Sequence, residues 1–359
     1  MGKHMRLSQL LAKSNLPFNV RHDPHIAGIT ADSRIVEHGS LFVAISGTHT
    51  DGRDYIDEAL SRGAVAILAS PDTPSPQMLN LNFEMIHHPD PRLALSLLAA
   101  AFYGQRPKFI AAVTGTNGKT SVASFCQHIW AYNNMPSASL GTLGLKQSHA
   151  IPVTESPDPR TTPDPVCLHR CLATLANEGT QHLVLEASSH GLHQKRLDGV
   201  PIAAAAFTNL TQDHLDYHGT MENYLEAKLA LFGRLLQPDG TAVINAESPY
   251  CAKVVEASQK EHNRAIWLYG KNSKAHLRLV SHKPNATGQT LELCIFGDMY
   301  TLNLPLVGYF QALNALAALG LAHAGGLPIA QALVALSRHP GVPGRLQQVA
   351  TTPHGASVF

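Results

Sequence analysis

The chain has 359 residues, of which 44% are hydrophobic and 15% charged, and its formal net charge is +1. This length predicts two or three domains, and the hydrophobic fraction excludes a disordered chain. The balanced charge argues against nucleic-acid partners, and no apolar run is long enough for membrane insertion. With five cysteines and no C-x-x-C pair, the composition predicts a cytoplasmic protein, which we expect to be a monomer.

Residues 1–105 mix short strands and helices, which predicts a small α/β domain. The apolar runs SLFVAISG (40–47) and GAVAILAS (63–70) are typical of buried strands. Between them, DYIDEALSRG has helical spacing and ends at Gly63. DPRLALSLLAAAFYG (90–104) predicts a closing helix with Asp90 as its N-cap.

From residue 106 to residue 345, apolar strand-like runs alternate with helical segments. This alternation predicts a mostly parallel sheet covered on both faces. Three later runs leave little room for crossover helices, so they predict a small antiparallel sheet appended to the main one. A long helix is expected at 308–326, ending at a glycine pair. The strand-like runs of the main sheet are FIAAVTG, HLVLEASS, AAAAFTNL and TAVINA, and those of the appended sheet are AHLRLVSH, TLELCIFG and MYTLNLPLVG.

The stretch AAVTGTNGKTSVASF (111–125) joins a predicted strand to a predicted helix through a glycine-rich turn. Gly118, Lys119 and Thr120 match the end of the phosphate-loop pattern G-x-x-x-x-G-K-[ST], but Val113 stands where that pattern has its first glycine. Lys119 would reach the terminal phosphates and the Thr120 hydroxyl would bind Mg²⁺. The alternative is a strand–helix turn that binds nothing.

The form TGTNGKT resembles the loop of the Mur ligases and their folylpolyglutamate synthetase relatives. The resemblance covers almost the whole chain, and is strongest to the UDP-N-acetylmuramoyl-tripeptide synthetases (MurE type). It is carried by ADSR (31–34), GSLFVAISGTHTDGRDYIDEALSRGAVAIL (39–68), LVLEASSHGL (183–192), FTNLTQDHLDYHGTMENYLEAK (207–228), GYFQALNALAAL (308–319) and PGVPGRLQ (340–347).

This resemblance implies three regions. Residues 1–105 would form an N-terminal UDP-sugar-binding domain and residues 106–345 a central P-loop-type ATP-binding domain. Residues 346–359 would begin a C-terminal Rossmann-like domain, which we expect to be missing. In the family that third domain carries the residues that select the incoming amino acid.

The implied activity is ATP-dependent ligation in peptidoglycan synthesis, with ATP and Mg²⁺ as cofactors. A carboxylate of UDP-MurNAc-L-Ala-D-Glu would attack the γ-phosphate to give an acyl phosphate, and the amine of a diamino acid would then displace phosphate. The diamino acid would be meso-diaminopimelate or L-lysine. The ATP-binding positions implied are Thr114, Gly115, Thr116, Asn117, Gly118, Lys119, Thr120, Asn314 and Arg345.

The resemblance also implies catalytic residues and metal ligands. The implied catalytic residues are Lys119, Glu186, His214 and Lys228, and the implied metal ligands are Thr120, Glu186, His214 and Lys228. Glu186 ends the strand HLVLE, where a carboxylate suits Mg²⁺, although it could be an ordinary strand-end glutamate. His214 would bind a second Mg²⁺; His214 and His218 are also spaced like a zinc pair on a helix, but the surrounding Asn and Asp residues favour a loop. Lys228 alone would be interpreted as a solvated lysine, whereas the resemblance implies that it is carbamylated.

The UDP-MurNAc-dipeptide positions implied by the resemblance are Ala31, Ser33, Thr48, His49, Thr50, Thr161, Thr162, Ser188, Gln194 and Arg196. Arg196 also suits a pyrophosphate or carboxylate partner on chemical grounds. Two other hypotheses remain. The chain could be another Mur ligase or a folylpolyglutamate synthetase, or it could be a truncated, non-catalytic fragment that binds ATP and the UDP-MurNAc peptide.

Overall fold

The computed structural model describes residues 5–16, 18, 20–47, 50–74, 76, 82–148, 158, 160–260, 262–285, 288–346, 350–351 and 357–358. The chain divides into two compact units, each described here by itself. Unit 1 comprises Met1–Arg106, Asp164–Thr174 and Gln194–Val200. Unit 2 comprises Pro107–Pro163, Leu175–His193 and Pro201–Phe359.

Unit 1 contains a four-stranded parallel sheet with strand order β3-β4-β5-β6. Successive residues of a strand face opposite sides. Leu41 and Val43 therefore pack in one core cluster with residues of α1 and α3, and Phe42 packs in the other with residues of α2. The strands of the unit are β1 Met5–Arg6, β2 His25–Ile26, β3 Gly28–Thr30, β4 Ser40–Val43, β5 Ala64–Ala69 and β6 Glu84–His87.

The helices of unit 1 begin and end close to the predicted positions. The Asp90 side chain accepts a hydrogen bond from the backbone N–H of Leu93 at 2.9 Å, which confirms it as the N-cap of α3. Gly63, just beyond α2, has a positive φ of 100°, so it ends the helix as predicted. The bounds are α1 Leu7–Lys13, η1 Ser33–Ile35, η2 Gly52–Tyr55, α2 Ile56–Ser61 and α3 Pro91–Tyr103.

Unit 2 contains a ten-stranded sheet with the order β16-β15-β14-β13-β12-β11-β7-β10-β8-β9. All neighbours from β14 to β8 are parallel, while β16-β15, β15-β14 and β8-β9 are antiparallel. The predicted combination of a mostly parallel sheet with an antiparallel part is thus confirmed. The antiparallel strands do not form a separate sheet, however, because β14 pairs with β13 and joins them to the main sheet. The strands are β7 Phe109–Thr114, β8 Ser137–Gly141, β9 Gly144–Gln147, β10 His182–Glu186, β11 Ile202–Phe207, β12 Leu236–Asn245, β13 Ala265–Gly270, β14 Leu277–Asn285, β15 Gly288–Ile295 and β16 Asp298–Leu304, with β17 Ala350–Thr351 and β18 Ser357–Val358 paired separately.

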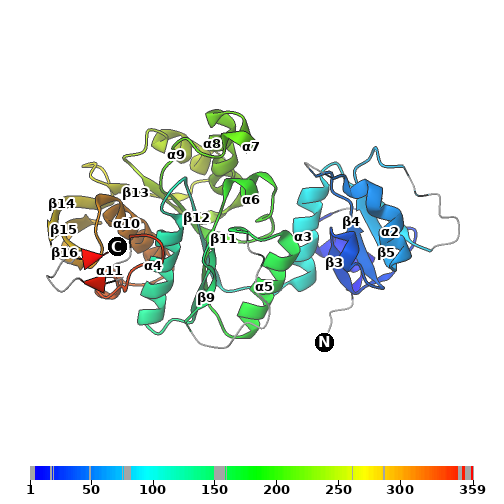
Figure 1. The fold of residues 1–359 in the computed structure, drawn as a ribbon, viewed down its shortest axis with the longest axis horizontal. Helices are drawn as coiled ribbons and strands as arrows, with labels where there is room; N and C mark the ends of the chain where they lie inside the picture. Colours follow the sequence, from blue (N-terminus) through cyan, green and yellow to red (C-terminus); the bar gives the residue numbers. More distant parts are fainter. Residues whose placement is uncertain are drawn as a thin grey trace. The chain divides into compact units, whose positions relative to one another are not determined.

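Helices cover both faces of this sheet. The α4, α10 and α11 helices pack together on one side, and α6, α8 and α9 lie together on the other (Figure 1). The predicted long helix is α10, which ends at Ala324 with Gly325 as its C-cap. The helical bounds are α4 Lys119–Tyr132, α5 Pro165–Asn177, α6 Ser189–His193, α7 Leu215–His218, α8 Met221–Ala230, a π-helical turn Leu231–Leu235, α9 Cys251–Gln259, α10 Tyr309–Ala324 and α11 Ile329–Leu336. Among the described residues, no helix is long and apolar enough to cross a membrane.

A buried histidine in unit 2 makes stability depend on pH. His339 is 3% exposed, with the rings of Phe125 and His128 each centred 4.7 Å from its own. Burial, with the nearby His128, lowers the pKa of His339 from 6.5 to about 3. The unfolded chain therefore binds a proton at this position more readily than the folded chain does. The contribution of neutral His339 to the free energy of unfolding is fully present above pH 6.5 and is lost as the pH falls towards 3.

We therefore expect the free energy of unfolding to fall by about 1.4 kcal/mol per pH unit below 6.5 through this one group. His339→Gln should flatten that part of the pH profile, whereas the same change at exposed His22 should not. Urea unfolding at a series of pH values measures both slopes. Identical profiles for wild type and His339→Gln would show that His339 does not control acid stability.

Candidate functional site

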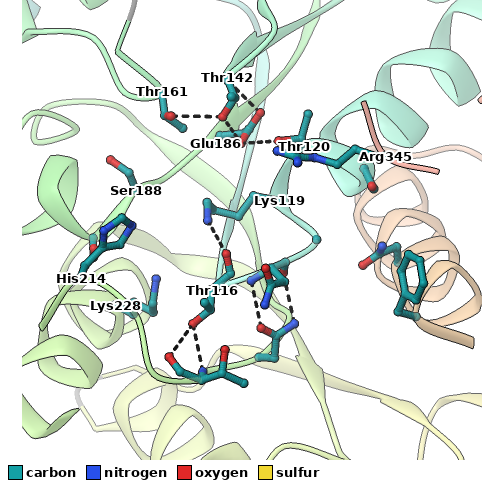
Figure 2. A pocket seen from close by; sticks show the side chains of 18 of the residues that line it. Thr116, Lys119, Thr120, Thr142, Thr161, Glu186, Ser188, His214, Lys228 and Arg345 are labelled. Atoms are coloured by element: carbon teal, nitrogen blue, oxygen red, sulfur yellow. Dashed lines mark hydrogen bonds between the residues drawn. The ribbon is translucent and has the colours of Figure 1, made fainter. Parts of the chain in front are cut away.

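A cavity of about 770 Å³ lies in unit 2, where the β7–α4 loop meets the ends of neighbouring strands. In open parallel α/β sheets, ligands bind outside the carboxyl ends of the strands, which is where this cavity lies. Figure 2 shows the side chains that point into the cavity from the loop, from the ends of β8 and β10, from α7–α8 and from the turn at residues 344–346. Among the predicted residues, the cavity brings together Thr116, Asn117, Gly118, Lys119, Thr120, Thr161, Glu186, Ser188, His214, Lys228, Asn314 and Arg345.

The loop before α4 is fixed by its glycines and by the end of β11. Gly115 has a φ of +147°, and a Cβ there would lie 1.9 Å from the Thr208 hydroxyl oxygen. Asn209 accepts hydrogen bonds from the backbone N–H groups of Thr116 and Asn117, at 2.9 and 3.0 Å. No side chain caps the N-terminus of α4. The first N–H groups of this helix are therefore available to an anion.

Lys119 lies at the centre of the cavity and folds back on its own loop (Figure 2). Its Nζ donates to the carbonyl oxygens of Gly115 and Thr116, both at 2.9 Å. Burial lowers the pKa of Lys119, although Glu186 acts in the opposite direction. An anionic ligand would offer this ammonium group a stronger partner than two neutral carbonyls.

Lys228 is buried, so its interpretation as a solvated lysine is wrong. It is 1% exposed, and its Nζ donates to the Gly115 carbonyl at 2.9 Å, the same oxygen that Lys119 contacts. The Nζ also lies 4.4 Å from the centre of the Tyr224 ring. Burial, with the nearby Lys119 charge, lowers the pKa of Lys228 well below its ordinary value. The neutral amine is therefore favoured at this position.

Glu186 is held by hydroxyl and backbone donors at the end of β10. Its Oε2 accepts hydrogen bonds from the hydroxyls of Thr120 at 3.0 Å and Thr142 at 3.1 Å, and its Oε1 accepts from the Thr142 backbone N–H at 2.9 Å. The residue is 3% exposed. These donors fix the orientation of the carboxylate towards Thr120.

The two histidines of the DHLDYHG stretch occupy different surroundings. His214 precedes α7 with a φ of +51°, is exposed, and lines the main cavity. His218 ends α7, so the prediction of a loop is wrong at that residue, and it lines a second cavity of about 520 Å³ bordered by α8. Burial lowers the pKa of His218 from 6.5 to about 4. Among the described residues, no three His, Cys, Asp or Glu side chains are grouped as metal ligands, so a zinc site has no support.

The opposite end of the cavity is formed by α10 and the turn that follows α11. Asn314 donates to the Gln311 side-chain oxygen at 3.0 Å, and Gln311 in turn donates to the Arg345 carbonyl at 3.2 Å. Asn314 is thus the buried amide that its helical setting indicates, yet it also lines the cavity. Phe310 and Leu346 add apolar surface beside it. Thr114 does not face the cavity, because its hydroxyl is fully buried and donates to the Ala187 carbonyl at 2.8 Å.

The residues expected to hold the UDP-MurNAc dipeptide are divided between the units. In unit 2, Thr161 and Ser188 line the cavity, whereas Thr162 is buried and donates to the Glu186 carbonyl at 2.8 Å. In unit 1, Arg196 donates to the Gln194 side chain at 2.7 Å.

The other predicted positions of unit 1 lie near the start of the chain. Ser33 is buried and donates from its hydroxyl to Glu58 at 2.8 Å, while Ala31 and Thr50 are exposed. Thr48 and His49 lie outside the described residues.

Sequence reasoning missed several residues that line the cavity. Thr142 had a usable signal, since GTLG (141–144) places a two-residue turn between glycines, as in a tight hairpin. Asn209, Thr211 and Tyr224 lie within the segment 207–228 that carries the family resemblance, but the resemblance implied no role for them. The missed lining residues are Ser121, Thr142, Ser189, Asn209, Thr211, Tyr224, Phe310, Gly344 and Leu346.

The fold and this site define a nucleotide-binding α/β protein with a phosphate loop. Residues 113–322 match the Mur ligase middle domain, and residues 25–103 match the Mur ligase family, catalytic domain. The chain therefore belongs to the Mur ligase family.

Curated relatives within this family carry one activity in their names. The UDP-N-acetylmuramoyl-L-alanyl-D-glutamate–2,6-diaminopimelate ligase of Brucella melitensis is 43% identical over 355 residues, which are 99% of this chain and 71% of that protein. The ligase of the same name from Rhizobium meliloti is 45% identical over 335 residues, covering 93% of this chain and 67% of that protein.

Solved structures agree with the fold. A diaminopimelate ligase of the same name has a TM-score of 0.83 at 28% identity, over 97% of this chain and 70% of that chain. The folylpolyglutamate synthase of Mycobacterium tuberculosis complexed with ADP has a TM-score of 0.61 at 21% identity, over 75% of this chain and 66% of that chain. The second likeness shows a shared fold only.

Proposed function

We propose that this chain is an ATP-dependent ligase that joins a diamino acid, diaminopimelate, to UDP-MurNAc-L-Ala-D-Glu in the cytoplasm. The observation that carries the proposal is the convergence of Lys119, Thr120, Glu186 and Lys228 on one cavity next to the α4 N-terminus. Relatives whose names specify this reaction are 43–45% identical over at least 93% of the chain.

The first step of the proposed reaction, formation of the acyl phosphate, has groups in the cavity that suit it. The loop and the α4 N-terminus would bind the triphosphate, and Lys119 would move from the two loop carbonyls to the terminal phosphate oxygens. Thr161 and Ser188 line the same cavity, and their hydroxyls would contact the substrate near its carboxylate. In this arrangement the attacking oxygen and the γ-phosphate would share one cavity, which is the main requirement of a phosphoryl transfer.

The oxygen donors of the site fit Mg²⁺. Thr120 Oγ1 and Glu186 Oε2 lie 3.0 Å apart, and hard oxygen ligands of this kind, completed by phosphates and water, are what Mg²⁺ prefers. Bound there, Mg²⁺ would neutralise charge developing on the transferred phosphoryl group. His214 lines the same cavity and stays a proposed ligand of a second Mg²⁺.

The surroundings of Lys228 support carbamylation. A neutral amine attacks CO₂, releases one proton and becomes an anionic carbamate. Burial, with the nearby Lys119, lowers the pKa of Lys228 and so favours the reactive neutral form, and the positive charge of Lys119 would then stabilise the anionic carbamate. The carbamate would supply a carboxylate-like oxygen ligand in the cavity that His214 also lines.

Phosphate release tests the proposal directly. The chain is incubated with ATP, Mg²⁺ and UDP-MurNAc-L-Ala-D-Glu, with meso-diaminopimelate in one arm and L-lysine in the other. We expect release that requires the UDP dipeptide and proceeds with diaminopimelate. Binding of the UDP dipeptide without turnover in either arm would favour a binding function, and no affinity for it would overturn the proposal.

A further inference from the structure

Four side chains at the cavity form one continuous hydrogen-bonded chain (Figure 2). The Thr161 and Thr142 hydroxyl oxygens lie 3.1 Å apart, and the Thr142 hydroxyl donates to Glu186 Oε2 at 3.1 Å. The Thr120 hydroxyl reaches the same carboxylate oxygen at 3.0 Å. This series of hydrogen bonds therefore runs from Thr161, on the proposed substrate side of the cavity, to Thr120, on the proposed metal side.

The direction of each hydrogen bond is fixed by chemistry. An ionised carboxylate only accepts, so the single hydroxyl proton of Thr142 is committed to Glu186. The contact between the two threonines must then be donated by Thr161. If Thr161 turns its proton towards a substrate oxygen, Thr142 loses the donor that strengthens its own bond to Glu186.

The β8–β9 turn holds Glu186 with more than this hydroxyl. Gly141 pairs with Gly144, so Thr142 and Leu143 alone form the turn. A Cβ on Gly141 would lie 2.2 Å from Glu186 Oε1 and 2.4 Å from its Cδ, so the glycine lets the carboxylate lie directly against the hairpin. The Thr142 N–H then donates to Oε1 at 2.9 Å. The backbone thus holds one carboxylate oxygen of Glu186, while the hydroxyls of Thr142 and Thr120 hold the other.

We propose that Thr142 is a positioning residue that couples occupancy of the Thr161 side of the cavity to the orientation of Glu186 towards Mg²⁺ and nucleotide. The inference rests on the proposed function, because it assumes that Thr161 contacts the UDP-dipeptide substrate. Coupling between two sites is reciprocal: if the UDP dipeptide changes the affinity for the metal nucleotide, the metal nucleotide changes the affinity for the UDP dipeptide by the same factor.

The test compares Thr142→Val, which keeps the shape and the backbone donor, with Thr142→Ser, which keeps the hydroxyl. Thr142 is exposed at the turn, so neither change disturbs the core. Calorimetry gives the affinity for ADP without metal, with Mg²⁺, and with Mg²⁺ plus UDP-MurNAc-L-Ala-D-Glu. Mn²⁺ binding in the presence of ADP, followed by electron paramagnetic resonance, adds a readout that needs no turnover.

All three proteins should bind metal-free ADP equally. In wild type and in Thr142→Ser, we expect Mg²⁺ to raise the affinity for ADP and the UDP dipeptide to change that affinity by a further factor of about five or more. Thr142→Val should lose most of both effects. A wild-type response to both ligands that persists in Thr142→Val would overturn the inference and leave the proposed function intact. A wild type that binds no UDP dipeptide would overturn the proposed function and the coupling, while the metal titration would still judge whether Thr142 orients Glu186.

Discussion

Lys119→Met is expected to lower the rate of phosphate release roughly 10²–10³-fold, the effect of removing one group that stabilises transition-state charge. The side chain is partly buried in the cavity, and its Nζ donates hydrogen bonds to the carbonyl oxygens of Gly115 and Thr116. Methionine has a similar length and no charge, so it fills the space without replacing the interaction with phosphate. ATP affinity should also fall, by about tenfold or more.

The matched control for this prediction is Lys274→Met. Lys274 is an exposed lysine of the same unit that does not line the cavity, so its removal changes the net charge equally. The control should keep the wild-type rate and ATP affinity, measured by phosphate release and by calorimetry. Equal losses in both variants would point to net charge, and wild-type values in Lys119→Met would show that this ammonium group does not act on phosphate.

Much of the fold was predictable because its elements carry local signals. Asp90 before Pro91 and a helical pattern predicts an N-cap, and the structure forms that hydrogen bond. Alternating apolar runs and helices likewise predict a parallel sheet. In contrast, the number of sheets depends on whether β14 pairs with β13, a contact between Tyr269 and Leu277 that no local pattern specifies.

The site was predictable only where a residue type itself carries the chemistry. Gly118, Lys119 and Thr120 are recognisable because few other roles need that order of residues. The burial of Lys228 could not be recognised from its residue type, because an amphipathic helix normally places lysines on its solvated face. Here a tertiary contact, the hydrogen bond to the Gly115 carbonyl, holds the lysine inside the protein. Thr142 acts through a hydrogen bond to Glu186, 44 positions along the chain, and a threonine in a turn gives no sign of such a partner.

Lys228→Met is the second change with a large expected effect, again about 10²–10³-fold in the rate of phosphate release. Methionine packs in the same buried space beside Tyr224 but forms no carbamate. Lys253→Met, at an exposed position on α9, is the control and should leave the rate unchanged. If the Lys228→Met rate matches the control, no ligand or charge from position 228 is needed.

The carbamate itself has a direct signature. With ¹³C-labelled bicarbonate, wild type should show one carbamate carbon resonance that Lys228→Met lacks and Lys253→Met retains. Burial and Lys119 lower the Lys228 pKa and so favour the neutral amine that forms the carbamate, and acidification should remove the resonance by protonating that amine. Activity and resonance should then decline together as the pH falls and return together when bicarbonate is added at neutral pH. Full activity without the resonance would assign Lys228 the role of a buried amine and leave the second Mg²⁺ without this ligand.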